Sequence, residues 1–398
     1  MLSLAYTIFN YSIQLVLVEI YGYKFRGLLE VLMSIIGLAS VIFSFNFYTA
    51  INLYTSKNKG APKNLGKIGS IIILVQLMVV IFIFVISTKD ESIKKNLSAV
   101  LLFPLICATL LNHKVNEFTA ILNGHQYFIR AKIMILTGAL FTAVSIGALY
   151  NFNLENEYIV MCVVLVGPFL GAFIYYRLLK IFDKKLTTEF GNLSFKALYI
   201  NNRGIYIISL SQFVAMKMYL LLLTQIGSLE VVGIFSFAYS ITQVVALPAT
   251  FLATIALSSE TDDLYPLIRP FFVVMIYSIA AGTCLKIGIA LDLMGFLPLS
   301  SMKAPAFVSM LNLMTLSIPF SVLNILVVAV AIRLNELSTV FIFNQIMLLP
   351  VLALCFFVLK ILLPLEQAIA GSYTIALLLV SVIGLVTIRY PISGKKRL

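Results

Sequence analysis

One lysine stands inside a stretch that otherwise has the composition of a membrane-spanning helix. The segment SLSQFVAMKMYLLLLTQ runs from Ser209 to Gln225 and places Lys217 at its centre. A lysine at mid-depth in a bilayer costs about 2.5–3.5 kcal/mol on insertion scales, and such charges are by default candidates for functional sites. Two other interpretations stay open: the side chain can snorkel toward the outer surface, or it can pair with a helix-end carbonyl or with Glu30.

Neutral polar side chains form stripes on several of the expected spans. Serine and threonine hydroxyls commonly hold membrane helices together, which is the simpler interpretation of most of them. Amide side chains cost more to bury and are better candidates for lining a wet cavity. Lys286, near the outer end of the ninth expected span, is a second candidate cation. The residues predicted to line a substrate cavity are Lys217, Gln212, Gln243, Asn10, Gln14, Ser240 and Lys286.

The motifs of common enzymes are absent from the sequence. There is no phosphate-binding loop with GK[ST], no HExxH and no nucleophile elbow. His113 and His125 are interpreted as residues of the fourth loop without companion ligands, so no metal and no cofactor are expected. Glu30 lies one turn inside the second expected span and Asp292 at the outer end of the ninth, which leaves no mid-membrane carboxylate for proton or sodium coupling. We expect a protein that is not an enzyme.

The composition indicates a helical membrane protein. The 398 residues are 61% hydrophobic and 11% charged, with a mean hydropathy of +1.05, whereas soluble domains carry about 25% charged residues. Apolar runs long enough to cross a bilayer recur along the whole chain. The net charge of +12 is attributed to the positive-inside rule and not to nucleic-acid binding.

The hydropathy pattern predicts an all-α polytopic protein with twelve transmembrane helices joined by short connections. The expected spans are about Leu2–Ile20, Gly27–Tyr54, Ile68–Ser87, Leu97–Asn116, Ile129–Tyr150, Glu157–Lys180, Gly204–Ile226, Glu230–Ala256, Pro266–Ala290, Ala306–Ile332, Leu337–Leu359 and Glu366–Arg389. Most lysine and arginine residues fall in the even-numbered loops and the C-terminus. Both termini are therefore predicted to be cytoplasmic, in the inner (plasma) membrane.

A weak internal repeat divides the chain near residue 190. ILNGHQYFIRAKIMI (Ile121–Ile135) and RLNELSTVFIFNQIM (Arg333–Met347) share a Leu-Asn turn, and a glycine opens the second span of each half, at Gly27 and Gly233. The pattern predicts two six-helix lobes, residues 1–190 and 191–398, as a parallel pseudo-repeat. Such repeats are one plan of transporters, with the substrate path between the halves.

The segment SLEVVGIFSFAYSITQVVALPATFLATIALS (Ser228–Ser258) resembles the eighth-helix region of the polysaccharide (O-antigen) flippases of the multidrug/oligosaccharidyl-lipid/polysaccharide exporter superfamily. FTAILNGHQYFIRAKIMI (Phe118–Ile135) is similar to the family's turn between helices four and five, and LLPLEQAIAGSYTIALLLVS (Leu362–Ser381) to its start of helix twelve. The chain departs from the family at Lys217, where an acidic-basic pair is common. The residues of Ser228–Ser258 that match are Gly233, Phe235, Ser236, Ala238, Leu247, Pro248, Ala253 and Thr254.

This resemblance implies the flipping of polyprenyl-diphosphate-linked oligosaccharide repeat units from the inner to the outer leaflet by alternating access, for O-antigen or capsule synthesis. Lys217 would then stabilise the anionic diphosphate in a low-dielectric cavity. Membrane lipids, and polymerase and chain-length proteins of the same pathway, are the other expected partners. Two alternatives stay open: a cation-coupled multidrug exporter of the same superfamily, and a membrane polysaccharide polymerase, which the short outer loops disfavour.

Overall fold

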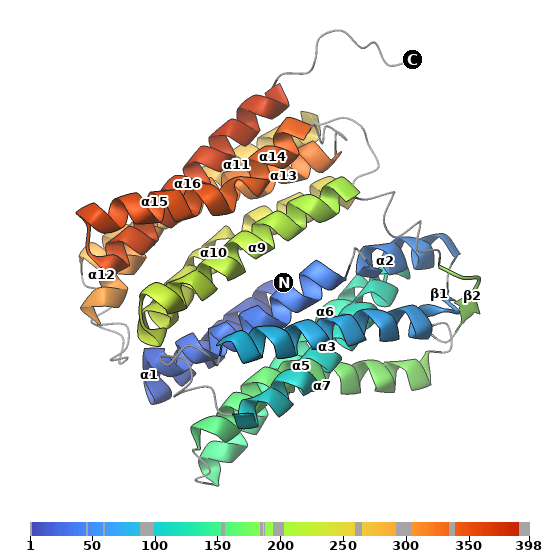
Figure 1. Ribbon diagram of the computed structural model, residues 1–398. Coiled ribbons are helices and arrows are strands. Elements are labelled where there is room, and N and C mark those ends of the chain that lie inside the picture. The colour runs from blue at the N-terminus through green and yellow to red at the C-terminus, as the bar shows by residue number, and fades with distance from the viewer. Residues whose placement is uncertain are drawn as a thin grey trace. The chain divides into compact units, whose positions relative to one another are not determined.

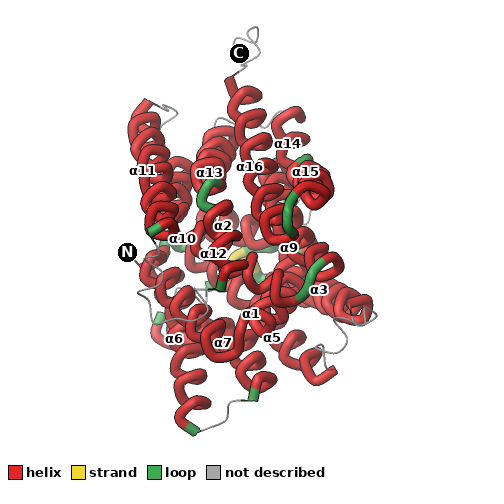
Figure 2. Tube along the Cα trace, turned by 90° about the vertical axis from the view of Figure 1, so that its left-hand side faces the viewer, coloured by secondary structure: helices red, strands yellow, loops and turns green. Residues whose placement is uncertain are grey.

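The computed structural model describes residues 2–44, 47–58, 60–87, 99–152, 156–183, 186, 188–193, 203–258, 265–291, 304–333 and 339–389. Helices make up nearly all of this part of the chain (Figures 1 and 2). The first half contains α1 (Leu2–Phe43), α2 (Phe47–Asn58), α3 (Leu65–Ser87), α5 (Leu102–Gly124), α6 (Phe128–Asn151) and α7 (Glu157–Phe182). The second half contains α9 (Arg203–Ile226), α10 (Leu229–Ser258), α11 (Tyr265–Ala290), α12 (Pro305–Met314), α13 (Ser317–Arg333), α14 (Thr339–Ile346), α15 (Leu348–Leu362) and α16 (Leu365–Arg389).

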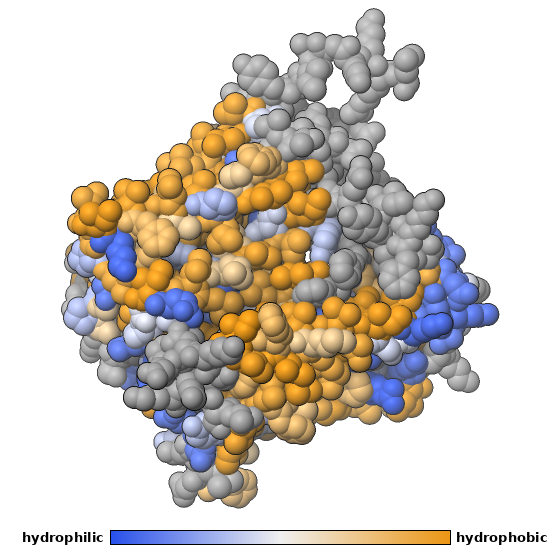
Figure 3. All heavy atoms as spheres, in the orientation of Figure 1, coloured by the Kyte–Doolittle hydropathy of each residue, from blue (hydrophilic) through white to orange (hydrophobic). Residues whose placement is uncertain are grey.

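Length and composition make this a multi-pass membrane protein. Among the described residues, 8 helices are long and apolar enough to cross a membrane, or up to 9 if the bent pair α12 and α13 forms one span. Many large apolar side chains on these helices are exposed, as lipid-facing residues must be. Figure 3 shows apolar side chains over α15, α16 and α3, and hydrophilic residues near the strands of the first half.

Five of the twelve predicted spans account for the difference from these counts. The first and second spans share α1, whose helix is broken at Gly22 by a non-helical φ of 77°. The fourth lies in α5, a helix that carries Lys114, Glu117 and several neutral polar residues and is not apolar enough to count as a span by the same criteria. The tenth is bent by 44° between α12 and α13, and the eleventh is divided into α14 and α15.

Prolines explain the two breaks in the second half. Pro319 has no N–H to donate to the carbonyl of Thr315, and α12 ends at Met314. In the same way Pro350 cannot donate to the carbonyl of Ile346, the last residue of α14. Hydropathy did not indicate these breaks because it averages over the length of a span and does not register a missing backbone N–H.

The contacts divide the chain into two compact units. Unit 1 comprises Met1–Leu17 and Leu28–Tyr206, and unit 2 comprises Val18–Gly27 and Ile207–Leu398. The short segment around the break in α1 therefore packs with the second half of the chain, while the rest of α1 packs with the first.

Unit 1 is built on α5, which contacts α2, α3, α6 and α7. Phe47, Leu122 and Met134 are fully buried in its core, and the ring of Phe118 stacks on that of Tyr176 with 3.7 Å between ring centroids. The strands β1 (Ala61–Pro62) and β2 (Glu189–Phe190) pair in parallel at one end of the unit. Next to them, the Asn64 amide donates to Leu193 O (2.9 Å) and accepts from Leu193 N (2.8 Å), so the chain is held to unit 1 up to residue 193.

Glycines allow α6 and α7 to pack with their backbones in contact. A Cβ on Gly138 of α6 would lie 2.0 Å from the carbonyl oxygen of Pro168 in α7, and a Cβ on Gly171 would lie 2.9 Å from Gly138 Cα. Small residues of this kind are what permit close approach of membrane helices.

Gly138→Ala is expected to destabilise unit 1 by about 1–3 kcal/mol, because the added methyl group forces the two backbones apart. Gly147→Ala on the same helix is the matched control, since nothing lies within 4 Å of its Cβ position. Thermal unfolding of the purified protein in detergent measures both. Equal stability of the two variants would contradict the close α6–α7 contact.

Unit 2 packs α10 against α13 and α12, and α16 against α13, α15 and α12. Aromatic side chains fill the centre: Phe235 contacts the rings of Tyr219 and Tyr373 edge-on, at 5.7 Å and 6.0 Å. The Tyr219 hydroxyl lies 2.9 Å from Ser372 Oγ. This buried tyrosine of α9 is therefore hydrogen-bonded to α16, and its ring also packs against Phe235 of α10.

Two glycines bring the segment Val18–Gly27 against α10 within unit 2. A Cβ on Gly27 would lie 1.8 Å from Leu229 O, and a Cβ on Gly233 would lie 1.9 Å from Tyr23 O. Each glycine thus faces the carbonyl of the residue four positions before the other, and the contact is nearly symmetrical. The glycines that the internal repeat equates are therefore in contact with each other's helices.

Candidate functional site

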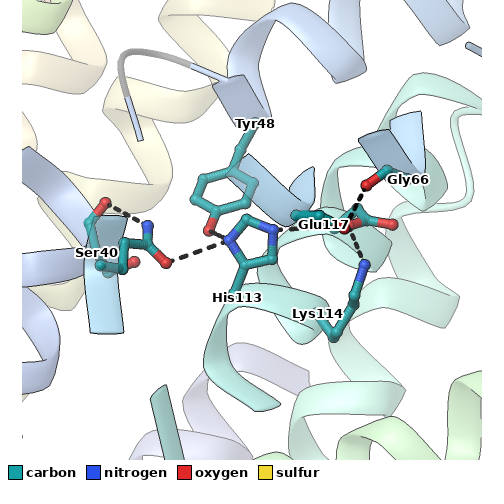
Figure 4. Close-up of polar contacts among 8 residues, drawn as sticks. Ser40, Tyr48, Gly66, His113, Lys114 and Glu117 are labelled. Atoms are coloured by element: carbon teal, nitrogen blue, oxygen red, sulfur yellow. Dashed lines mark hydrogen bonds and ion pairs between the residues drawn. The ribbon is translucent and has the colours of Figure 1, made fainter. Parts of the chain in front are cut away.

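A buried polar cluster lies in unit 1, between α5, α3, α2 and the second part of α1 (Figure 4). His113 and Glu117 stand four residues apart on one face of α5, where their exposed fractions are 0% and 5%. The ring of Phe47 lies parallel to that of His113, at 5.9 Å and 16°. Two titratable side chains are thus enclosed among apolar groups of the same unit.

Two neutral polar groups contact Nδ1 of the histidine. His113 Nδ1 lies 2.9 Å from the Tyr48 hydroxyl and 3.2 Å from Gln76 Oε1. The amide of Gln76 is itself oriented, because its Nε2 donates to Ser40 O at 3.4 Å. These contacts hold the imidazole in one position from two neighbouring helices and α1.

Glu117 contacts two basic side chains of its own helix. Its Oε2 accepts a hydrogen bond from Lys114 Nζ at 2.8 Å and lies 3.8 Å from His113 Nε2. Gly69 of α3 covers this gap, since a Cβ there would lie 3.3 Å from each of these two atoms. The absence of a side chain at Gly69 is what lets α3 approach the pair.

The sequence-based placement of His113 was wrong. It was assigned to the fourth loop, whereas α5 continues to Gly124 and both His113 and Glu117 are buried. Glu117 is a buried carboxylate that was not singled out from the sequence. The i, i+4 spacing of His113 and Glu117 was the available signal, because it puts both on one helix face. His125 follows α5 directly and stacks on Tyr127.

Lys217 lies in the middle of α9 in unit 2. Its side chain is half-buried, and Nζ lies 5.9 Å from the centre of the Phe213 ring one turn earlier. An ammonium over an aromatic face at this distance gains a modest electrostatic attraction. The charge expected from the sequence is therefore within an apolar helix and in contact with an aromatic ring.

Gln212 joins a chain of amides that connects three helices of unit 2. Its Nε2 donates to Gln345 Oε1 of α14 at 3.0 Å, and Gln345 Nε2 donates to Asn324 Oδ1 of α13 at 3.4 Å. Gln345 is fully buried and Asn324 nearly so. Sequence analysis selected Gln212 and missed its two partners, because only the packing of α9, α13 and α14 brings the three amides together.

The other predicted cavity residues are placed as follows. Ser240 and Gln243 are half-buried on α10, and Ser240 Oγ donates to Ser236 O at 2.8 Å. Lys286 is exposed on α11. Asn10 and Gln14 are half-buried on α1 in unit 1, where Gln14 Oε1 is buried and has no hydrogen-bond partner among the described residues. Unit 2 contains the remaining five.

The described residues hold no group of three or more His, Cys, Asp or Glu side chains that could bind a metal ion.

The solved structures that match this fold include a lipid flippase and MATE multidrug transporters. The chain matches the lipid II flippase MurJ in an inward closed conformation over 98% of its own length and 87% of that chain, with a TM-score of 0.70 and 13% identity. It matches an inward-facing multidrug resistance MATE family transporter of the MOP superfamily over 98% and 95%, also with a TM-score of 0.70 and 13% identity. The MATE multidrug transporter DinF-BH matches over 98% and 92%, with a TM-score of 0.63 and 12% identity.

No family model matches the sequence, and the search of curated proteins gives no match. The structural likeness covers almost the whole chain and defines the fold class. This is an all-α polytopic membrane protein, as predicted from hydropathy, and its fold is similar to those of a lipid II flippase and of MATE transporters.

Proposed function

We propose that the protein flips a polyprenyl-diphosphate-linked oligosaccharide from the inner to the outer leaflet of the plasma membrane, for surface polysaccharide (O-antigen or capsule) synthesis. The observation that carries the proposal is the fold match to a flippase of a lipid-linked substrate over 98% of the chain. Two six-helix lobes, residues 1–190 and 191–398, would alternate access, with both termini in the cytoplasm. Polymerase and chain-length proteins of the same pathway are the proposed partners.

Lys217 is proposed to bind the diphosphate. A hydrogen bond to a charged group is worth about 1.5–3 kcal/mol, and more than one such bond can form between an ammonium and the oxygens of a diphosphate. Gln212, Gln243, Ser240, Asn10 and Gln14 are proposed to contact the sugar or to line the path, and Lys286 to attract the anionic headgroup.

A cation-coupled multidrug exporter is the second candidate. The match to MATE transporters is as good as that to the flippase, and Glu117 supplies the buried carboxylate that such an exporter uses and that the sequence analysis did not find. The two functions differ in cargo and are separated by one experiment.

The test is the level of lipid-linked oligosaccharide in cells that lack the protein, complemented with wild type, Lys217→Ala or Lys217→Arg at matched membrane levels. We expect the intermediate to accumulate on loss and wild type to reverse it. Lys217→Ala should reduce export about tenfold or more, which corresponds to at least ~1.4 kcal/mol of lost binding. Lys217→Arg should retain part of the activity because it keeps the charge.

Accumulation reversed equally by all variants would keep the flippase function and remove Lys217 from the site. Absence of accumulation, together with sensitivity of the deletion strain to a cationic dye, would favour the multidrug exporter.

A further inference from the structure

The contacts around His113 define which ring nitrogen carries the proton in the neutral imidazole. An amide oxygen only accepts hydrogen bonds, and Gln76 Oε1 lies 3.2 Å from Nδ1. The orientation of that amide follows from its other end, where Nε2 donates to the backbone oxygen of Ser40. A proton on Nδ1 satisfies both of its contacts, because the Tyr48 hydroxyl oxygen at 2.9 Å can accept a hydrogen bond as Gln76 Oε1 does, and it leaves a lone pair on Nε2.

That lone pair faces a carboxylate across a gap that lacks a proton. His113 Nε2 is buried and has no hydrogen-bond partner among the described residues, yet Glu117 Oε2 lies only 3.8 Å away. A charged N–H···O hydrogen bond has a length of about 2.7–2.9 Å. The two acceptors are thus near each other without a donor between them, and addition of one proton to Nε2 would let them form such a bond.

We propose that His113 and Glu117 form a binding site for one proton in the interior of unit 1, whatever the cargo. In the empty state Glu117 is paired with Lys114 and His113 is neutral. In the occupied state the proton is on His113 Nε2, which donates to Glu117 Oε2. Occupancy adds one positive charge to a site that Phe47 and Gly69 enclose, and it makes two cations compete for the same carboxylate oxygen.

Burial disfavours the charged form of His113, and the charges around the site raise or lower the cost of adding the proton. Lys114 of the same helix lies against Glu117, and its side chain is 36% exposed. From α7, Lys180 and Tyr176 interact electrostatically with Glu117. From α2 the titratable group is Tyr48, and α3 contributes the uncharged Gln76 and Gly69. Glu117 favours the bound proton, whereas Lys114 and Lys180 oppose it.

Because the chain contains only 2 histidines, the proton can be followed directly. The full-length protein is labelled on histidine nitrogen, reconstituted in lipid nanodiscs and titrated by NMR from about pH 8 to about pH 3, which extends below the usual imidazole range because burial disfavours the charged ring. A His125→Asn variant leaves the signal of His113 alone. We expect a neutral ring protonated at Nδ1 at high pH, which takes up one proton at Nε2 as the pH falls.

Two variants test the roles of the partners. Glu117→Gln, which has nearly the same shape, should lower the midpoint of His113 protonation by about one pH unit or more, because an opposite charge within ~4–6 Å is lost. Lys114→Gln should raise the midpoint, because a like charge is lost. If Glu117→Gln does not fold, the upward shift in Lys114→Gln still tests the site.

Three results would overturn the proposal: a His113 ring that stays neutral throughout the range, a neutral ring protonated at Nε2, or a midpoint that neither variant moves. None of these measurements depends on transport, so failure of the proton site and failure of the proposed flippase function are distinguishable.

Discussion

Replacing Gly27 or Gly233 by alanine is expected to destabilise unit 2 by about 3 kcal/mol or more, at the upper end of the cost of overpacking. The reason is that each added Cβ would meet a backbone carbonyl oxygen, at 1.8 Å for Gly27 and 1.9 Å for Gly233. A backbone atom cannot rotate away as a side chain can, so the helices must separate. Separation would also weaken the packing of Tyr23 on the rings of Phe237 and Phe307.

The measurement is the thermal unfolding midpoint of the detergent-purified protein. Gly66→Ala is the control, because nothing lies within 4 Å of its Cβ position, and it should leave the midpoint nearly unchanged. The double variant Gly27→Ala/Gly233→Ala should cost less than the two single changes together, since one separation of the helices accommodates both methyl groups. Single variants as stable as Gly66→Ala would disprove the glycine contact.

His113→Leu is expected to destabilise unit 1 by about 2–4 kcal/mol. Leucine fills a similar volume, so the main loss is polar: Gln76 Oε1 and the Tyr48 hydroxyl lose their contact with Nδ1. A buried polar group left without its partner costs about 1–3 kcal/mol. The change also removes the parallel contact with the ring of Phe47.

His125→Leu is the matched control, because His125 follows the end of α5 and is partly exposed. Chemical or thermal unfolding of the two variants in the same detergent gives the comparison. The loop placement of His113 inferred from sequence predicts that both variants behave alike. The structure predicts that only His113→Leu lowers the unfolding midpoint. Equal stability of the two variants would contradict the burial of His113.

The positions of most spans could be predicted from the sequence, because insertion into a bilayer depends on the apolar content of about 20 consecutive residues. α6, α7, α11 and α16 agree with the predicted bounds within a few residues. Lys217 could be found for the same reason: a charge within an apolar helix is visible without any knowledge of neighbouring helices.

The extent of α5 was missed because its last turns carry His113, Lys114 and Glu117, which resemble a loop in composition. These residues continue the helix because α2, α3 and α7 cover them. The neighbouring helices supply hydrogen bonds and packing to this polar face of α5. Hydropathy is calculated along one helix and does not include these contacts. The local signals at Pro319 and Pro350 were present in the sequence, and they act through a missing backbone N–H.

Composition, charge distribution and the spacing of apolar residues were sufficient for the class of protein, the approximate spans and the isolated lysine, since each of these depends on one helix and its solvent. The pairing of Gly27 with α10, the amide chain from Gln212 to Asn324 and the facing lone pairs of His113 and Glu117 required the tertiary structure. In each of these cases the stability of the contact depends on atoms of a second helix or on burial by a second helix. The distance between the two helices cannot be obtained from the sequence.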